Sequence, residues 1–492
     1  MTPARTTAHD PGAHTTAHDP GAHTTAHDRT DSSYLEYAFY TFDTGVANLQ
    51  AYCAPTLDYE NTRGRRFAVS IDNGPLTILH LPAEQTGPVW SSLVGDNIAI
   101  VGTSIHLSRQ GPHILRYWKV DPGVVLEKIV LDLGGAKACY LGPPETPMRP
   151  GLKDYFRDDF PVGVAVSPYS LKGPDTGLIL QQFNSLTPEN VMKMGPIHPL
   201  EQQYHFGEAD SIVAFAQAHG LRVRGHNLCW HQQTPAWLFK DDTAGLDTRA
   251  SATGGNRVTK DVLLQRLKDH ITTVVGRYKG RIYAWDVVNE AISDDSTQFL
   301  RNSLWYQICG EDFIKKAFQY AHAADPVAQL FYNDYNTERP EKRNRVYRLL
   351  KDLVDEGIPI TGVGLQGHWS IYEPSGKDLR DAIEQFSSLG LKVQITELDV
   401  SVYPWEKNDR ARLSTDSDTL TQDLQERQSR QYKALFDIFR EYASVISGVT
   451  FWNITDRHTW LDDYPVKGRK NYPLLFDTEG APKEAYWEVT GQ

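Results

Sequence analysis

The sequence predicts an α/β protein in which an all-β sandwich precedes a (β/α)8 barrel. Three observations lead to this fold class. The chain has 492 residues, enough for two to four domains. Residues 31–144 carry short β-branched and aromatic runs separated by Gly, Pro, Asn and Asp, a pattern typical of sandwiches. After them, apolar strand patterns alternate with helical patterns to the end of the chain, as in a barrel.

The composition and charge of the chain exclude several function classes. With 40% hydrophobic and 23% charged residues, the chain falls in the globular range. Its 62 acidic and 50 basic residues give a net charge of -12, which argues against nucleic acid or an anionic membrane as the partner. No stretch approaches the roughly 18 apolar residues of a membrane span. The sequence therefore predicts a soluble protein with a neutral partner.

The cysteines and the first residues bear on the compartment. No CxxC pair occurs, so the sequence supports neither a zinc ribbon nor a redox motif, and we expect four free thiols: Cys53, Cys139, Cys229 and Cys309. The N-terminal residues lack the apolar segment of a secretory signal, which predicts a cytoplasmic protein. A signal preceding this sequence would instead predict a periplasmic or secreted one.

Residues 1–30 contain one nonapeptide, Thr6–His14, written almost three times. The tract has little apolar surface to bury, so it is predicted to be a disordered tail. Its histidines leave metal chelation open as an alternative to a solvated tail. They are His9, His14, His18, His23 and His27.

Residues 31–144 are predicted to form the β-sandwich module. The expected strands are 34–42, 66–71, 76–81, 97–107, 113–120 and 124–133. A Pro-rich stretch, Gly142–Pro150, then marks a junction, and residues 145–155 are predicted as a linker.

Residues 156–492 are predicted to form the barrel. Eight strand patterns end near Val166, Leu186, Leu228, Val288, Tyr332, Gly364, Ile395 and Trp452. Amphipathic patterns over 261–278 and 343–356, each with a Gly shortly after its end, are typical of the intervening helices.

Two carboxylates mark the candidate site. In a barrel of this kind, chemistry gathers at the C-terminal ends of the strands. The apolar run of the fourth unit ends in Asn289-Glu290, and that of the seventh ends in Thr396-Glu397. A pair of carboxyl groups facing one cleft is what glycosidic bond cleavage requires, with one group protonated and the other ionised.

Residues 154–487 resemble the catalytic domain of glycoside hydrolase family 10, the β-1,4-xylanases. Within the matching motifs, Glu290 in Trp285–Glu290 corresponds to the general acid/base and Glu397 in Ile395–Asp399 to the nucleophile. The resemblance implies a retaining endo-β-1,4-xylanase that cleaves xylan or xylo-oligosaccharides by double displacement, with carboxyl groups roughly 5–5.5 Å apart.

The resemblance also implies supporting residues. Asn289 would hold the sugar 2-hydroxyl, and Gln366 and His368 would bond the catalytic carboxylates. Strand alternation aims Gln366 and His368 the same way, and Asp399 would support His368.

Further matching residues imply sugar contacts. The predicted glycone-side residues are Glu189, Asn190, Lys193, His226, Trp230 and Gln233. Trp452 and Trp460 match tryptophans that stack on the sugar near the cleavage point, and Asn453 stands where many relatives have Gly.

Other interpretations of these residues stay open. Each tryptophan could be core packing. His226, His231 and His368 could suggest zinc, but they belong to different strands without ligand spacing, and the resemblance implies no metal and no cofactor. The rival functions are a non-catalytic xylan-binding protein and an exo-acting or oligosaccharide-specific xylanase inside the cell.

The N-terminal module is similar to the C-terminal β-sandwich of family 115 xylan α-glucuronidases. The resemblance rests on Tyr40–Gly45, Val120–Val125 and Tyr140–Glu145. Three aromatic residues, Trp90, Trp118 and Tyr140, could form a sugar-stacking platform. Core packing or a homodimer formed through the module are the alternatives.

Overall fold

A computed structural model describes residues 5–6, 34–41, 44–58, 64–84, 86–133, 150–241, 257–406 and 408–491. The chain divides into two compact units, Met1–Met148 and Arg149–Gln492, and each is described by itself. The repeats of the tail, Cys139 and Tyr140 lie outside the described residues, apart from Arg5 and Thr6.

Two antiparallel sheets make up the described part of the first unit. One has the order β1-β2-β7-β4-β5 and the other β6-β3-β8. The strands are β1 (Arg5–Thr6), β2 (Tyr34–Thr41), β3 (Gly45–Cys53), β4 (Arg66–Ile71), β5 (Thr77–His80), β6 (Ala99–Leu107), β7 (Gly111–Lys119) and β8 (Leu126–Asp132). Leu49, Phe67, Val69 and Leu115 belong to the hydrophobic core formed by residues of both sheets.

Strand β1 lies in the tail that was predicted to be disordered, and two larger elements, β3 and α1, were not expected either. Strand β3 is the middle strand of the second sheet, and it buries Ala47, Leu49 and Ala51. Its inward residues are mostly small and weak strand formers, which is why its pattern does not stand out in the sequence. Helix α1 (Gly87–Asp96) has Pro88 in its first turn, and Asn97, which has a left-handed backbone, caps its C-terminal end. None of its residues is buried, so no strong apolar stripe marks it.

The second unit is a parallel barrel. Around the ring its strands are β9 (Val162–Val166), β10 (Ser185–Pro188), β11 (Arg222–Cys229), β12 (Ala284–Asn289), β13 (Gln329–Asp334), β14 (Gly362–Leu365), β16 (Lys392–Ser401) and β17 (Ile446–Phe451). Strand β17 pairs with β9 and closes the ring, while the short β15 (His368–Ser370) extends the sheet beside β16. The predicted (β/α)8 barrel is confirmed, and all eight predicted strands are present.

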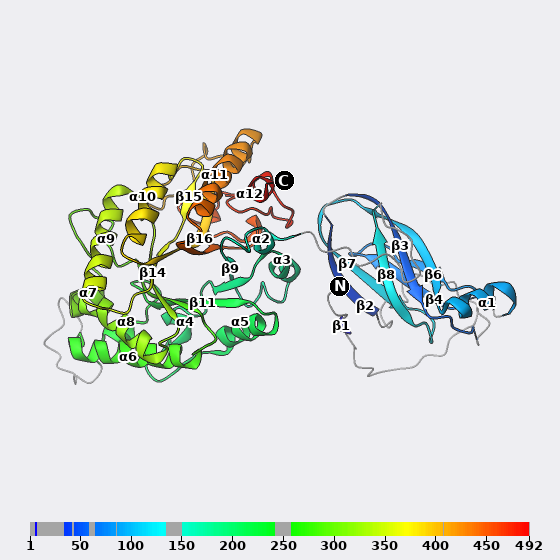
Figure 1. Ribbon diagram of the computed structural model, residues 1–492, viewed down its shortest axis with the longest axis horizontal. Helices are drawn as coiled ribbons and strands as arrows, with labels where there is room; N and C mark the ends of the chain where they lie inside the picture. The colour runs from blue at the N-terminus through cyan, green and yellow to red at the C-terminus, as the bar shows by residue number, and fades with distance from the viewer. Residues whose placement is uncertain are drawn as a thin grey trace. The chain divides into compact units, whose positions relative to one another are not determined.

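Helices surround the strands (Figure 1). They are α2 (Leu152–Tyr155), α3 (Asp175–Gln182), α4 (Met194–Ile197), α5 (Gly207–Ala218), α6 (Lys260–Arg277), α7 (Leu304–Cys309), α8 (Asp312–Ala324), α9 (Pro340–Asp355), α10 (Gly376–Ser387), α11 (Gln422–Glu441) and α12 (Glu484–Thr490). Short 3-10 turns are η2 (Ala236–Phe239), η3 (Asp456–His458) and η4 (Trp460–Asp462). The two predicted helices correspond to α6 and α9, and α2 lies within the segment predicted as a linker.

A buried charge pair crosses the inside of the barrel. Arg224 is fully buried, and its Nε donates to Asp286 Oδ2 at 3.2 Å. The guanidinium also bonds Gln394 and lies 4.5 Å from the ring centroid of Phe331. Each nitrogen of the guanidinium and each oxygen of the Asp286 carboxylate has a hydrogen-bond partner, which a buried ion pair requires.

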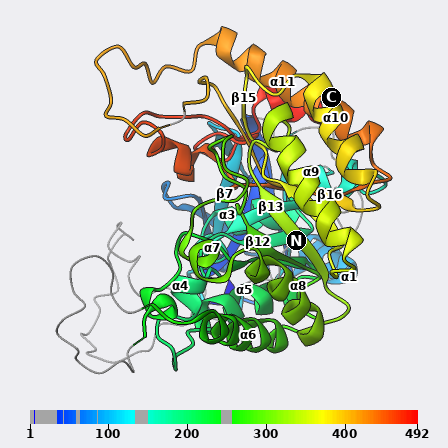
Figure 2. The same cartoon turned by 90° about the vertical axis from the view of Figure 1, so that its left-hand side faces the viewer.

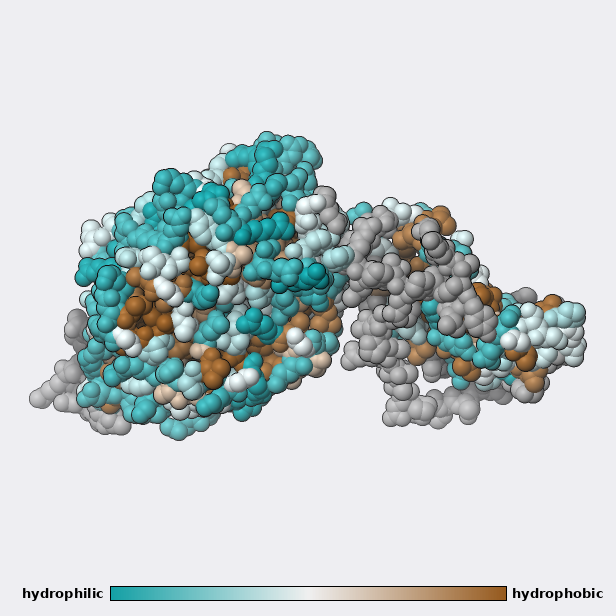
Figure 3. All heavy atoms as spheres, viewed as in Figure 1, coloured by the Kyte–Doolittle hydropathy of each residue, from teal (hydrophilic) through white to brown (hydrophobic). Residues whose placement is uncertain are grey.

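The surface of the barrel unit is mostly hydrophilic on the face shown in Figure 3, with hydrophobic residues in small patches. The loops that follow β16 and β17 leave the barrel on the same side (Figure 2), and Arg410 N–H donates to Pro465 O between them at 2.9 Å.

Among the described residues, no helix is long and apolar enough to cross a membrane. Cys53, Cys229 and Cys309 are buried free thiols.

Two buried histidines form an uncharged pair between α4 and α6. His198 Nε2 lies 3.0 Å from Glu201 O and must donate to that carbonyl. His198 Nδ1 is then the acceptor in neutral histidine, so His270 Nδ1 donates across the 3.1 Å contact between the rings. Protonation of His198 Nδ1 would bring two N–H groups against each other and break this hydrogen bond. Burial, with His198 beside it, lowers the pKa of His270 to about 3.

This pair predicts an acid-sensitive contribution to stability. Between pH 6.5, the approximate pKa of histidine in the unfolded chain, and pH 3, His270 is protonated in the unfolded chain but not in the folded protein. Acid therefore favours the unfolded chain, and the free energy of unfolding decreases as the pH is lowered from about 6.5 to about 3. Because Gln carries no titratable proton, we expect the free energy of unfolding of His270→Gln to change with pH less steeply than that of the wild type. The difference in slope should be about 1 kcal/mol per pH unit between pH 6 and 4. Urea unfolding followed by tryptophan fluorescence at several pH values measures it, and parallel curves for the two proteins would contradict it.

Candidate active site

Backbone pairing brings the predicted site residues to one level of the barrel. Glu290 N–H donates to Asn333 O at 2.9 Å, Gln366 N–H to Asp334 O at 3.0 Å, and Glu397 N–H to Gln366 O at 2.6 Å. These bonds continue the ladder past the ends of β12, β13 and β14. The side chains from the fourth to the seventh units therefore meet at the C-terminal edge of the barrel, as the sequence predicted.

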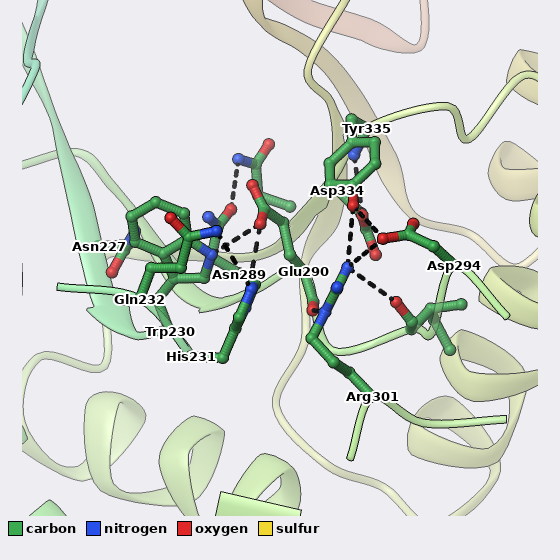
Figure 4. A network of polar contacts seen from close by, with 12 residues as sticks. Asn227, Trp230, His231, Gln232, Asn289, Glu290, Asp294, Arg301, Asp334 and Tyr335 are labelled. Atoms are coloured by element: carbon green, nitrogen blue, oxygen red, sulfur yellow. Dashed lines mark hydrogen bonds and ion pairs between the residues drawn. The ribbon is translucent and has the colours of Figure 1, made fainter. Parts of the chain in front are cut away.

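Glu290 is held by hydrogen bonds to both carboxyl oxygens. Trp230 Nε1 donates to Oε2 at 2.7 Å, and Gln366 Nε2 donates to Oε1 at 2.9 Å. Figure 4 shows Trp230 and His231 on one side of Glu290, and Arg301 and its acidic partners on the other. A pocket beside Glu290 is lined by Trp230, His231 and Arg301, among others.

The surroundings of Glu290 favour its protonated form. Burial raises the pKa of Glu290, and the nearby Asp334 raises it further, against the bonds from Gln366 and Trp230. His231 lies 4.0 Å from Glu290 Oε2, but burial lowers the pKa of His231 to about 4, so this histidine adds no positive charge at neutral pH.

Glu397 has a different set of partners. Asn333 Nδ2 donates to Glu397 Oε1 at 2.8 Å, and His368 Nε2 lies 3.2 Å from Oε2. The other nitrogen of His368 lies 2.9 Å from Asp399 Oδ2, which also accepts a bond from Trp460 Nε1 at 2.9 Å. The Asp399–His368–Glu397 chain predicted from the sequence is thus present.

Charge around Glu397 favours its ionised form. Burial alone would raise the pKa of Glu397, but the His368 hydrogen bond and the charges of His226, His368 and Lys193 lower it to about 2. Burial alone would lower the pKa of His368, and Asp399 with Glu397 raises it to about 10. Glu397 therefore carries its negative charge beside a protonated histidine.

The sixth strand reaches both carboxylates in an unexpected way. Strand β14 ends at Leu365 and β15 begins at His368, with Gly367 at φ +81° between them. A side chain on Gly367 would come within 2.9 Å of Ile395 Cγ2. Gln366 and His368 do contact Glu290 and Glu397, but regular strand alternation is not the reason, because the strand is interrupted between them.

The predicted glycone-side residues of the second unit lie beside the carboxylates. Lys193 Nζ donates to Asn190 Oδ1 at 3.0 Å and lies 5.1 Å from the ring centroid of Trp230. Burial lowers the pKa of Lys193, although Glu397, Glu189 and Glu290 oppose this. Burial raises the pKa of Glu189, with Lys193 opposing. Gln233 Nε2 donates to Asn190 Oδ1 at 3.4 Å.

The remaining predicted residues contact side chains of neighbouring barrel units. His226 Nδ1 lies 3.0 Å from Asp286 Oδ2, and its ring lies edge-on to Trp452 with 5.2 Å between centroids. His368 lies edge-on to Trp460 at 4.9 Å. The side-chain amide of Asn289 contacts that of Asn333. Trp452 is largely buried and Trp460 is partly exposed.

The sequence reasoning assigned no role to three residues that complete the site. Asn333 bonds Glu397 directly, the charge of Asp334 raises the pKa of Glu290, and Asp286 bonds both His226 and Arg224 inside the barrel. Asn333 and Asp334 follow an apolar run at a strand end, the same signal that identified Glu290. Asp286 is a charged residue inside an apolar run, which signals a paired interior charge.

Asn333 depends on the absence of a side chain at Gly364. A Cβ on Gly364 would lie 2.2 Å from Asn333 Oδ1 and 2.8 Å from Thr396 Cγ2. Thr396 Oγ1 donates to Asn333 Oδ1 at 2.6 Å, which orients the amide so that Nδ2 faces Glu397.

Among the described residues, no group of three or more His, Cys, Asp or Glu side chains is placed to hold a metal ion.

Known proteins resemble both parts of the chain. Residues 9–145 match the family described as Glycosyl hydrolase family 115 C-terminal domain. A Beta-1,4-xylanase of Dictyoglomus thermophilum is 48% identical over 340 residues, which cover 69% of this chain and 90% of the relative. Endo-1,4-beta-xylanase B of Paenibacillus barcinonensis is 46% identical over 70% of this chain and 98% of its own.

Solved structures agree with the sequence relatives. The crystal structure of xylanase XynB from Paenibacillus barcinonensis, complexed with a conduramine derivative, has a TM-score of 0.65 and 45% identity. It covers 70% of this chain, and all of that chain is matched. Residues 151–492, more than half of the sequence, match the family described as Glycosyl hydrolase family 10. The chain therefore belongs to glycosyl hydrolase family 10, through the barrel that carries the two buried glutamates.

Proposed function

We propose that this protein is a retaining endo-β-1,4-xylanase in which Glu290 is the general acid/base and Glu397 the nucleophile. The observation that carries the proposal is the opposite effect of the surroundings on two buried carboxyl groups. Burial and Asp334 keep a proton on Glu290, while His368 and nearby positive charge keep Glu397 ionised. Double displacement at a glycosidic bond needs this division of roles.

In the first step, the Glu397 carboxylate attacks the anomeric carbon and Glu290 gives its proton to the departing glycosidic oxygen. The covalent glycosyl-enzyme bond forms as the glycosidic bond breaks. Asn333 Nδ2 and His368 Nε2 contact the two oxygens of Glu397 and fix the direction of the attack. Trp230 and Gln366 fix Glu290 in the same way.

In the second step, the ionised Glu290 takes a proton from water, which attacks the anomeric carbon and releases Glu397. The loss of negative charge on Glu397 in the intermediate matters here. Because like charges disfavour ionisation of a neighbour, the pKa of Glu290 falls once Glu397 is esterified, and Glu290 becomes a base.

The predicted sugar-contacting residues beside the two glutamates suit a sugar polymer that is mostly uncharged. Asn190 accepts hydrogen bonds from Lys193 and Gln233, and Lys193 Nζ lies 5.9 Å from the ring centroid of Trp452. The xylanase names of the relatives support xylan as the substrate. A non-catalytic xylan-binding protein is disfavoured, because binding alone needs no such division between the two glutamates.

Paired substitutions separate the two roles. We expect Glu290→Ala to lower xylan hydrolysis about 10³-fold, yet to leave glycosyl-enzyme formation from a dinitrophenyl xylobioside nearly intact, because this leaving group needs no proton. Glu397→Gln removes the nucleophile and should abolish both reactions. Reducing-sugar release and the dinitrophenol burst measure them. Near wild-type hydrolysis by Glu397→Gln contradicts the assignment.

The pH dependence of kcat/KM tests the role of Asp334. Hydrolysis requires protonated Glu290, so the alkaline limb reports its pKa. Asp334→Asn removes a negative charge that raises this pKa, so the alkaline limb should move to lower pH, while the acid limb stays. An alkaline limb that does not move, measured with the same xylo-oligosaccharide, would show that Asp334 does not act on Glu290.

The endo mode predicts a product pattern. Xylohexaose should give xylobiose, xylotriose and xylotetraose early in the reaction, and polymeric glucuronoxylan should lose viscosity before much reducing sugar appears. An exo-acting enzyme would instead release one product size from the start. Chromatography of the first products decides between the two modes.

A further inference from the structure

The backbone of Glu290 has an unusual conformation. Its φ is +56°, in the left-handed region that residues with a side chain rarely occupy. Such a conformation persists only where the surrounding structure holds it. The backbone N–H of Glu290 donates to Asn333 O at 2.9 Å, which fixes one end of the residue to β13. The other end is its carbonyl group, where the chain leaves β12.

Arg301 holds this carbonyl group. Its Nε donates to Glu290 O at 3.1 Å, and its own backbone N–H donates to Ala291 O at 2.8 Å. The segment between them folds back on itself, because Ile292 and Leu300 form an antiparallel bridge. The side chain of Arg301 therefore returns to the peptide group that directly follows the buried carboxyl group.

The guanidinium of Arg301 has fixed partners on its other side (Figure 4). Its Nη2 donates to Tyr335 Oη at 2.9 Å and to Asp294 Oδ2 at 3.0 Å. Tyr335 Oη also donates to this Asp294 oxygen at 2.5 Å. A guanidinium is planar and rigid, so bonds at Nη2 determine where Nε points. The group that holds the carbonyl of Glu290 is therefore itself held in place.

The contacts of Arg301 and those of the carboxyl group lie at different ends of Glu290. Trp230 and Gln366 bond the carboxyl oxygens, whereas Arg301 bonds the backbone from which the side chain departs. Because the backbone dihedrals set the direction of Cβ, a rotation of the carbonyl group would displace the carboxyl group. Proton transfer depends on the position of the acid, and a displacement of about 1 Å can cost about 10²-fold in rate.

We propose that Arg301 is a positioning residue for Glu290. Its planar guanidinium, set by Tyr335 and Asp294, keeps the backbone of Glu290 in the conformation that aims the carboxyl group at the glycosidic oxygen. The inference rests on the proposed function, in which Glu290 gives and takes the proton. Since Arg301 acts through Glu290, its loss matters only in steps that need proton transfer.

The test compares two substrates that differ in their need for a proton. We expect Arg301→Met to lower kcat/KM on xylohexaose about 30-fold, because a misplaced acid must protonate the departing sugar. On dinitrophenyl xylobioside, kcat/KM reports formation of the glycosyl-enzyme without a proton, and it should stay within about twofold of the wild type. Equal losses on both substrates would show a general structural role and overturn the inference, as would no loss on either.

Arg301→Lys gives a second measurement, which also decides the matter if the methionine variant does not fold. Lysine keeps the positive charge but offers a single nitrogen in place of the planar fork. We expect a loss on xylohexaose that is again absent on dinitrophenyl xylobioside. A wild-type ratio of the two kcat/KM values would mean that the charge alone suffices, against the proposal.

A double variant tests whether Arg301 acts through Glu290. Once Glu290→Ala has removed the acid, no carboxyl group is left to position. Adding Arg301→Met to Glu290→Ala should therefore lower the residual hydrolysis of xylohexaose no further. A further loss as large as that caused by Arg301→Met alone would show that the two residues act independently, which contradicts the proposal.

Arg345→Met is the matched control. Arg345 belongs to α9, and its Nη1 donates to Ser293 O at 2.7 Å and to Gln298 O at 2.9 Å. It thus fixes the same loop that leads to Arg301, but through residues beyond Glu290. We expect the wild-type ratio of the two kcat/KM values. A selective loss on xylohexaose equal to that of Arg301→Met would overturn the specific assignment to Arg301.

The proposed function and this inference can fail separately. A wild type that does not hydrolyse xylohexaose would overturn the proposed function. If the wild type hydrolyses it and the Arg301 variants lose activity equally on both substrates, the proposed function stands and only the positioning role of Arg301 is wrong.

Discussion

The backbone hydrogen bonds that tie the C-terminal ends of β12, β13, β14 and β16 together are the constraint on which the site depends. They fix Glu290 against Asn333, and Glu397 against Gln366, so each glutamate is joined to a strand whose side chains support the other. Gln366 bonds Glu290 through its side chain and Glu397 through its carbonyl. A shift in the register of β13 or β14 would therefore disturb the partners of both carboxyl groups.

The division of labour between the glutamates comes from their neighbours, because both are buried and burial raises the pKa of each. Positive charge is concentrated on one of them: His368, His226 and Lys193 favour ionised Glu397. Around Glu290 the nearby histidine is neutral, and the negative charges of Asp334 and Glu397 raise the pKa of Glu290. The polar groups named in the site all belong to residues 150–491, within the second unit.

Apolar runs that end abruptly in polar residues allowed the strands of the barrel and both glutamates to be predicted from the sequence. Such runs report burial and strand ends, because both depend on local pattern. They do not report partners in space, so the link from Asn333 to Glu397 and the role of Asp334 could not be found in this way. Strand β3 was missed because Ala47 and Ala51 face its core, and the interruption at Gly367 was missed because a positive φ at glycine leaves no periodic signal.

Gly364 shows how closely the interior of the barrel is fitted to the chemistry. The space that its missing side chain would fill is taken by the amide of Asn333 and the methyl group of Thr396. A larger residue at position 364 could be accommodated only with a smaller one at 333 or 396, and a smaller residue at 333 gives up the bond to Glu397. Residues 333, 364 and 396 can therefore change in evolution only together. A substitution at one of them alone gives an enzyme whose nucleophile, Glu397, is impaired.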